Sequence, residues 1–359
     1  MKLGRIGGTE NDGVCRLALT DEEIEARRLL ITWADEIGLS VHTDDISNLF
    51  FCLEGAETDA PPIVTGSHID SQPTGGKFDG AFGVVAGFEA VQAIQESGVV
   101  PTKPIEIVVW MNEEGSRFSP GMMGSEAFTG RRPMEQILEV KDVNGVRTAE
   151  ALEKTLAMFP NIKRRSLGFP MTAFIEAHIE QGPILEELGV PVGVVTGIQG
   201  SRRFRVRVTG DEGHAGTLPM SERKDALFSA LEMIGAMRQA FDTDQVKFTT
   251  GLFQVSPNVP SVVPSNVLFS IDIRHPDGQT LKRLGNAISG LCEENSGPCS
   301  VEVMEIATSD SLEFPDEIRA CISGSAQELG IESKSILSMA GHDARQLHYH
   351  CPTGMIFSP

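Results

Sequence analysis

The first 200 residues alternate between short apolar segments and helical segments, and this alternation is the strongest constraint on the fold. Residues 61–70 (PPIVTGSHID) and 104–115 (PIEIVVWMNEEG) carry nearly unbroken apolar runs, which are typical of buried strands. Residues 48–55 (NLFFCLEG) also have strand character, and residues 82–98 have helical spacing that ends near Gly98. Strands that alternate with helices predict an α/β domain with a mainly parallel sheet.

The start of the first helix is marked by residues 20–23 (TDEE), which form a capping box. In this motif the Thr20 oxygen accepts a hydrogen bond from the Glu23 amide, and the Glu23 side chain reaches back. The helical spacing that follows stops at Gly38.

The pattern changes after about Gly200. Residues 202–210 (RRFRVRVTG) alternate polar and apolar side chains, which is typical of a half-exposed antiparallel strand. Helical segments at residues 223–241 and 280–295 and strand segments at 245–255, 266–277 and 300–306 complete a small α+β unit. We therefore expect residues 1–200 and 312–359 to form a catalytic domain, with residues 201–311 inserted into it.

Composition limits the classes of partner. The formal net charge is −20, and the hydrophobic content of 40% with 22% charged residues fits a globular protein with a sizeable core. A surface this acidic repels nucleic acid and anionic membranes, so we expect neither as a partner.

The six cysteines are scattered and none has Cys-x-x-Cys spacing, which favours free thiols in a reducing compartment. No apolar run reaches membrane length, and residues 1–13 lack the apolar core of a signal peptide. We expect a cytoplasmic protein.

Side chains that commonly bind metals follow the predicted buried strands. They are His68, Asp70, Asp79, Glu113, Glu114 and His178. In an open α/β sheet, ligands bind beyond the carboxyl ends of the strands. A mixture of imidazole and carboxylate suits zinc, manganese, cobalt or nickel better than calcium or magnesium.

Spacing within residues 66–80 (GSHIDSQPTGGKFDG) suggests separate roles. His68 would coordinate an ion, and Asp70, two residues along an extended segment, would orient the imidazole. Gly75 and Gly76 would let the backbone turn sharply, and the Asp79 carboxylate could bridge two metals. Any one of these residues alone is more often an ordinary hydrogen-bonded polar group, so the joint occurrence carries the hypothesis.

Several stretches in a fixed order resemble the M20 superfamily of dinuclear-metal hydrolases. They are GSHIDSQPTGGKFDGAFGVVAGFEA, NEEGSRFSPGMMGS, EAHIEQGPILE, GHAGTLPMSERKDAL, SIDIRH and AGHDA. More narrowly, the chain resembles the group of N-carbamoyl-L-amino-acid hydrolases, β-ureidopropionases and allantoate amidohydrolases. The form DSQPTGG resembles the carbamoylases more than the allantoate enzymes.

The resemblance implies specific residue roles. His68, Asp79 and His178 would bind one metal, and Asp79 with Glu114 would bind a second. Glu113 would be the general base, and His214 would stabilise the developing oxyanion. The residues implied to contact substrate are Gln181, His214, Asn258 and Arg274. From the residues alone, a turn histidine is the preferred interpretation of His214, and Arg274 could instead form a salt bridge with Asp272 or Asp277.

The resemblance also implies an activity and an assembly. The expected reaction is hydrolysis of the carbamoyl C–N bond of a small ureido acid to an amino acid, ammonia and carbon dioxide. The inserted domain would make a homodimer, and two divalent ions would bind each subunit. An allantoate hydrolase, an aminoacylase, a dipeptidase or a metal-poor inactive homologue remain alternatives.

One departure from the family pattern concerns the second metal. The family takes a last histidine ligand from downstream of a segment like residues 352–357 (PTGMIF), and this sequence ends at Pro359. We therefore expect weak binding, or none, at the second metal position. His348 and His350 are possible substitutes, although a surface role is favoured for both.

Overall fold

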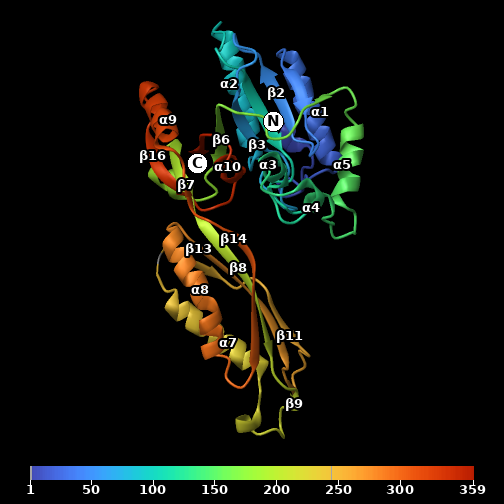
Figure 1. Ribbon diagram of the computed structural model, residues 1–359, viewed down its shortest axis with the longest axis vertical. Coiled ribbons are helices and arrows are strands. Elements are labelled where there is room, and N and C mark those ends of the chain that lie inside the picture. Colours follow the sequence, from blue (N-terminus) through green and yellow to red (C-terminus); the bar gives the residue numbers. More distant parts are fainter. Residues whose placement is uncertain (1, 244) are drawn as a thin grey trace. The chain divides into compact units, whose positions relative to one another are not determined.

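The computed structural model describes residues 2–243 and 245–359, which divide into two compact units (Figure 1). The first unit comprises Met1–Thr196 and Phe314–Pro359, and the second comprises Gly197–Glu313. The insertion expected at residues 201–311 lies within the second unit.

The first unit is built on a mixed sheet with the strand order β7-β17-β6-β3-β4-β2-β1-β5, and β16 pairs with β7. Its four central strands, β17, β6, β3 and β4, are mutually parallel, and antiparallel pairs flank them. The strands are β1 (Ser40–Thr43), β2 (Leu49–Leu53), β3 (Ile63–His68), β4 (Ile105–Trp110), β5 (Lys163–Arg164), β6 (Ala173–Ile179), β7 (Val192–Ile198), β16 (Ser333–Ser338) and β17 (Thr353–Ser358). The prediction of an α/β fold with a mainly parallel sheet is confirmed.

Helices cover this sheet. They are the 3-10 helix η1 (Leu3–Arg5) and α1 (Asp21–Glu36), α2 (Ala81–Glu96), α3 (Met123–Phe128), α4 (Met134–Leu138), α5 (Thr148–Ala157), α6 (Ile184–Leu188), α9 (Asp316–Glu328) and α10 (Ala344–Leu347). The apolar faces of α1 and α2 pack on β2 and β4 through Leu30, Val84 and Ile107. A separate core joins α3, α4 and α5.

The capping box at the start of α1 is confirmed in part. The Thr20 oxygen accepts from the Glu23 amide, and α1 begins at Asp21 as expected. The Glu23 carboxylate does not return to Thr20, because it accepts from the Leu19 amide at 2.7 Å and pairs with Arg27 at 2.9 Å. Burial of both charged side chains explains this choice, since each needs a partner away from water.

The second unit is an antiparallel sheet with the order β10-β13-β8-β14, and β11 also pairs with β13. The strands of this sheet are β8 (Gly200–Thr209), β10 (Lys247–Thr249), β11 (Phe253–Ser256), β13 (Asn266–His275) and β14 (Ser300–Ser309). Strands β9 (Gly213–His214) and β12 (Val262–Val263) pair with each other separately, and β15 (Leu312–Glu313) pairs with residues 197–198 at the end of β7. The segment expected as one strand at residues 245–255 is two short strands, β10 and β11.

The helices of the second unit are η2 (Met220–Glu222), α7 (Ala226–Ala240) and α8 (Gly278–Glu294). Helices α7 and α8 pack on one face of the sheet (Figure 1). The alternation read from the sequence is confirmed, because Phe204, Val206 and Val208 of β8 point into this core.

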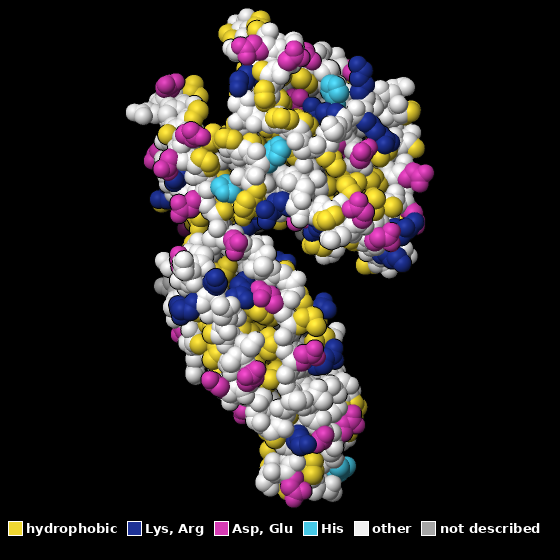
Figure 2. All heavy atoms as spheres, in the orientation of Figure 1, with side chains coloured by type: hydrophobic (Ala, Val, Ile, Leu, Met, Phe, Trp, Pro, Cys, Tyr) yellow, Lys and Arg dark blue, Asp and Glu magenta, His cyan; other side chains and the backbone are white. Residues whose placement is uncertain are grey.

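The surface carries charges of both signs. On the face drawn in Figure 2, acidic and basic side chains are interspersed over both units. None of the helices within residues 2–243 and 245–359 combines the length and apolar character needed to cross a bilayer.

Candidate metal centre

The candidate centre lies where two neighbouring parallel strands separate. His68 is the last residue of β3, and His178 is near the carboxyl end of β6. The β3–β6 ladder ends at Thr65 and Ile175, and the first turn of α2 approaches the strands at Gly83. The two imidazole rings lie beyond this point, with their centroids 5.9 Å apart.

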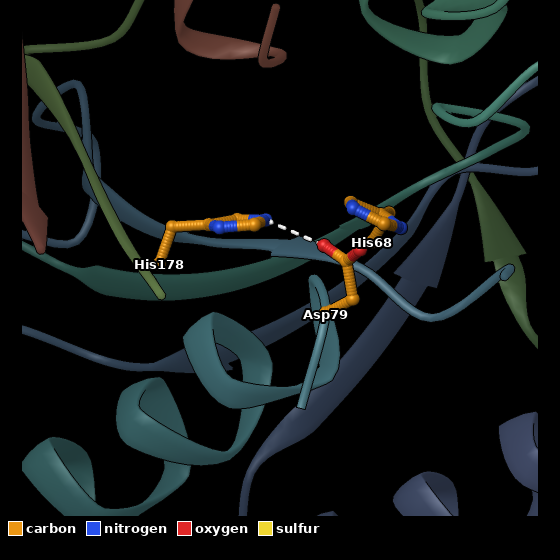
Figure 3. Close-up of side chains that lie close together, drawn as sticks. All are labelled: His68, Asp79 and His178. Carbon is orange, nitrogen blue, oxygen red and sulfur yellow. Dashed lines mark ion pairs between the residues drawn. The ribbon is translucent and has the colours of Figure 1, made fainter. Parts of the chain in front are cut away.

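Asp79 reaches the two histidines from the loop that precedes α2 (Figure 3). One ligand atom from each of His68, Asp79 and His178 lies within 4.8 Å of the others. The closest pair is His178 Nε2 and Asp79 Oδ1, at 3.3 Å. Three residues that the sequence analysis singled out, far apart in the chain, therefore converge.

Hydrogen bonds orient both imidazoles for ligation. His68 Nδ1 lies 2.9 Å from the Asp70 carbonyl oxygen, and His178 Nδ1 lies 2.9 Å from the Ile179 carbonyl oxygen. A carbonyl oxygen only accepts, so each Nδ1 carries the hydrogen and each Nε2 presents its lone pair toward the candidate centre. The Nε2 of His178 accepts from the Gly80 amide at 3.2 Å, a bond that a metal ion there would replace.

The two imidazoles differ in electrostatic environment. Burial and the neighbouring His68 lower the pKa of His178 to about 4. Burial also acts to lower the pKa of His68, but the carboxylates of Glu113 and Asp70 outweigh it and raise this pKa well above the ordinary value. Carboxylates that favour a proton on His68 would equally favour a metal cation at that position.

The glycine that matters most for the centre is Gly80. Its φ is +63°, and a Cβ there would lie 2.3 Å from Nε2 of His68. Gly75 and Gly76, expected to make the sharp turn, do not have positive φ, and a Cβ at Gly76 would meet nothing within 4 Å. The backbone does turn at Gly75, whose amide bonds to the Gln72 carbonyl oxygen at 3.2 Å, but the glycine with positive φ that packs against His68 is Gly80.

Asp70 has a wider role than orienting His68. Its backbone oxygen makes the 2.9 Å contact to His68 Nδ1, and its carboxylate lies 3.5 Å from the same nitrogen. The carboxylate also accepts from the amides of Glu113 at 3.1 Å and Glu114 at 3.2 Å. Asp70 thus connects the end of β3 to both glutamates that follow β4.

Glu113 is almost fully enclosed and faces His68. Its Oε2 lies 3.5 Å from His68 Nε2, and its side chain is 9% exposed. Burial raises the pKa of Glu113 well above the ordinary value, His68 opposes this effect, and Asp343 and Glu114 add to it. A carboxylate in this environment has a strong tendency to take up a proton.

Glu114 bonds to the loop that follows β3. Its Oε2 accepts from Gln72 Nε2 at 2.6 Å, and its Oε1 is buried without a hydrogen-bond partner. Burial raises the pKa of Glu114, and the nearby Asp79 adds to the increase. A buried carboxylate oxygen without a donor, next to a second carboxylate, matches the chemistry of a cation site.

A second group, Glu176, His178 and His342, also has the composition of a metal site, and the sequence analysis did not identify it. Its atoms are already bonded within the protein. The Glu176 carboxylate accepts from Ser67 and from the Ala344 amide, and His342 Nε2 lies 3.1 Å from the Ser338 hydroxyl. We therefore interpret this group as support for His178, whose ring packs on His342 with centroids 4.5 Å apart.

The sequence contained signals for the residues that support His178. Glu176 is a charged residue inside an otherwise apolar strand, and His342 and Asp343 follow the strand β16. Both carboxyls are fully buried, so burial raises the pKa of Glu176 to about 7 and the pKa of Asp343 well above its ordinary value. The Ser125 hydroxyl donates to Asp343 at 2.5 Å, which links α3 to the start of α10.

Gln181, expected to contact substrate, lies at the candidate centre. Its side-chain amide donates to both oxygens of Asp79, at 3.2 and 3.0 Å, and its φ is +56°. In this conformation Gln181 restrains the carboxylate expected to bridge two metals.

The remaining expected residues belong to the second unit. His214 lies on β9, is exposed and accepts from the Gly216 amide at 3.1 Å. Asn258 is exposed and lies at the rim of an open groove that Arg207 also lines. Arg274 makes the ion pair weighed as its alternative role, with Nε 3.0 Å from Asp272 Oδ1. Substrate contact by these three residues stays a prediction.

His348 and His350 are engaged away from the candidate centre. His350 Nε2 bonds to the Phe169 carbonyl oxygen at 2.9 Å, and its ring packs on Phe128. His348 packs against Phe314. Both are half-buried and keep part of their surface exposed, and within the described residues neither belongs to a group that could hold a metal.

The sheet order and the convergence of His68, Asp79 and His178 define an α/β protein with a candidate metal centre at the carboxyl ends of its strands. The sequence pattern of peptidase family M20/M25/M40 matches residues 64–359. The chain belongs to this family.

Characterised relatives refine the comparison. The chain is 35% identical over its full length to the N-carbamoyl-L-amino-acid amidohydrolase of Rhizobium meliloti, of which it covers 86%. It is 34% identical over 99% of its length to the allantoate amidohydrolase of Bacillus subtilis, of which it covers 87%. A crystal structure of a hydantoinase/carbamoylase family amidase from Burkholderia multivorans is 38% identical and superimposes on all of this chain and 88% of that one, with a TM-score of 0.90.

Proposed function

We propose that this protein is a metal-dependent amidohydrolase that cleaves the carbamoyl C–N bond of N-carbamoyl-L-amino acids. The products are the amino acid, ammonia and carbon dioxide. The observation that carries the proposal is the convergence of His68, Asp79 and His178 in a chain similar along its whole length to proteins with this name.

The residues of the centre fit a divalent cation. Two imidazole nitrogens and a carboxylate oxygen are close together, and the other nitrogen of each ring is already bonded. The orphaned Oε1 of Glu114 and the close packing of Gly80 against His68 support the same assignment. His68, Asp79 and His178 would hold one ion, and Asp79 with Glu114 would contribute to a second position. Zinc, manganese, cobalt and nickel match this donor set.

A divalent ion held by His68, Asp79 and His178 would lower the pKa of a bound water molecule and would polarise the substrate carbonyl. Glu113 accepts the proton of the attacking water, because its enclosed carboxylate favours the protonated form. The same carboxyl then gives this proton to the departing nitrogen, so that ammonia leaves as a neutral molecule. The N-carboxy amino acid that remains then loses carbon dioxide, its carboxyl proton passing to the nitrogen, to give the amino acid. Asp70 keeps Glu113 beside His68 through the Glu113 amide.

The remaining expected roles complete the proposal. His214 donates to the developing oxyanion, Arg274 binds the substrate carboxylate, and Gln181 and Asn258 are assigned to substrate binding. Arg274 presents a guanidinium whose Nε side is held by Asp272, which restricts its conformations. The second unit carries the homodimer contact. Six free cysteines favour a reducing, cytoplasmic location.

The test is a substrate panel. The full chain is loaded with zinc, manganese, cobalt or nickel, and ammonia or amine release is measured from an N-carbamoyl-L-amino acid, its D-enantiomer, an N-acetyl amino acid, a dipeptide and allantoate. We expect the N-carbamoyl-L-amino acids to give the highest kcat/KM. A higher value with allantoate would favour the activity named for the Bacillus subtilis relative, and hydrolysis of none of them would contradict the proposal.

A further inference from the structure

The two candidate histidines stand on strands that no longer pair with each other at the level of the imidazoles. The β3–β6 ladder joins Thr65 to Ile175 and stops there. Each strand continues to pair on its other side, since His68 lies opposite Trp110 of β4 and His178 lies opposite Phe357 of β17. There is therefore a gap between β3 and β6 at the level of the imidazoles, and no backbone hydrogen bond between these two strands sets the distance between the rings.

The Glu176 side chain spans this gap. Its Oε1 accepts from the Ser67 hydroxyl at 2.6 Å, and Ser67 is the residue directly before His68. Glu176 lies two residues before His178, so both side chains point to the same side of β6. A side-chain hydrogen bond thus continues the connection between β3 and β6 one step beyond the last backbone pair.

The other Glu176 oxygen has a partner from a third element. Its Oε2 accepts from the Ala344 amide, at the start of α10, at 2.8 Å. Two donors from different parts of the chain therefore determine the conformation of one carboxylate. Glu176 and Ser67 are both fully buried. Burying a carboxylate is costly compared with an apolar side chain of similar size, so packing alone does not explain a glutamate here.

We infer that Glu176 is a positioning residue that sets the separation of the His68 and His178 imidazoles and thereby the affinity of the centre for a divalent cation. The inference rests on the proposed metal ligands. Metal–ligand distances tolerate only about 0.2 Å of variation, so small changes in strand separation weaken binding. Loss of a group that supports a metal ligand typically lowers metal affinity about 10–100-fold.

The test measures metal affinity directly. Full-length variants are stripped of metal, and their zinc affinity is measured by competition with a chromophoric chelator. The visible absorption of the cobalt(II) form reports ligand geometry. Glu176→Ala removes both hydrogen bonds, and Ser67→Ala removes the bond next to His68. Glu176→Gln can keep both, because the Ser67 hydroxyl can accept from the glutamine amide while the glutamine oxygen accepts from Ala344.

The matched control is Thr65→Val. Thr65 also joins the same two strands through its side chain, by a 2.8 Å hydrogen bond to the Ile175 carbonyl oxygen, but it lies where the backbone ladder is intact. Circular dichroism and thermal unfolding of each metal-free variant show whether it is folded. A role limited to strand stability would lower the metal-free unfolding temperature without changing the cobalt spectrum.

We expect Glu176→Ala to lower zinc affinity about 10–100-fold and to alter the cobalt spectrum, with a smaller loss in Ser67→Ala. Glu176→Gln should restore affinity to within about threefold, and Thr65→Val should leave it unchanged. Wild-type affinity in folded Glu176→Ala, or in Ser67→Ala if the first variant does not fold, would overturn the inference. An equal loss in Thr65→Val would also overturn it. A wild-type chain that binds no metal would refute the ligand assignment itself.

Discussion

At the residue scale, two adjacent carboxylates occupy different environments. The amides of Glu113 and Glu114 are both held by Asp70, but their side chains diverge. Glu113 faces His68 and is nearly enclosed, whereas Glu114 is bonded to Gln72 and keeps one buried oxygen without a partner. The first environment suits proton transfer and the second suits cation binding.

Glu113→Gln should separate these two roles. The amide keeps the shape but cannot accept a proton, so we expect metal content to stay normal while kcat falls by two to four orders of magnitude, about 3–5 kcal/mol of barrier. Metal is measured by elemental analysis and kcat by ammonia release. Glu114→Gln is the control, and it should lose rate together with any metal at the second position while keeping the first ion. Near-normal turnover in Glu113→Gln would exclude Glu113 as the general base.

Gly80 offers a second prediction at this scale. Alanine there would combine a positive φ with a Cβ 2.3 Å from His68 Nε2. We expect Gly80→Ala to displace the imidazole, to lower zinc affinity at least about tenfold and to cost about 1–3 kcal/mol of stability. Gly76→Ala is the matched control in the same loop, since its Cβ would meet nothing within 4 Å. Equal zinc affinities in the two variants would contradict this account of the turn.

At the element scale, strand β13 carries an ion-pair network on the face opposite the helices. Asp272 accepts from Arg203 of β8 at 3.0 Å and from Arg274 of β13 at 3.0 Å. Burial acts to raise the pKa of Asp272, but the two arginines outweigh it and hold this pKa below its ordinary value of 3.8. The network therefore stabilises the charged form of Asp272 in the folded state.

The sign of this shift predicts a pH dependence. Because the folded-state pKa is lowered, the stabilisation is fully present above the unfolded-state pKa and is lost as the pH falls through the folded-state value. The difference in unfolding free energy between wild type and Asp272→Asn should therefore be constant from pH 7 to pH 5. We expect this difference to shrink below about pH 4, where Asp272 takes up a proton. Urea unfolding followed by circular dichroism measures it. A difference that grows on acidification would contradict the assigned direction.

At the scale of the whole molecule, the candidate centre ties together segments that are distant in the chain. Its residues come from the ends of β3 and β6, the loop before α2 and the segment after β4. An ion bound to all of them would stabilise the folded state of the first unit, because the unfolded chain does not present these groups together.

Metal removal should therefore have two consequences. Dialysis against a chelator should abolish carbamoyl hydrolysis and lower the unfolding temperature, and zinc or manganese should restore both. At a free metal concentration about 100-fold above Kd, the stabilisation is about 2.7 kcal/mol. Activity is followed by ammonia release and unfolding by calorimetry. Full activity with no measurable metal would rule out a metal-dependent mechanism.

Local pattern made much of the molecule predictable. The apolar runs of β3 and β4 and the alternation in β8 indicate strand type because side-chain period and burial are local properties. The one segment interpreted wrongly, residues 245–255, is divided between β10 and β11, which pair with different parts of β13. That division depends on the partner strand, which local pattern does not contain.

The sequence by itself indicated the α/β class and the change of pattern near Gly200, because side-chain period and burial are local properties. It also indicated candidate metal-binding residues after the buried strands, and the resemblance to the M20 superfamily implied the grouping of His68, Asp79 and His178. Only the tertiary structure decided how these side chains are supported. It showed that Gly80 makes the critical turn, that Asp70 holds both glutamates and that Glu176 bridges the gap between β3 and β6. Each of these facts concerns contact between segments far apart in the chain, and such contacts exist only once the strands are assembled side by side.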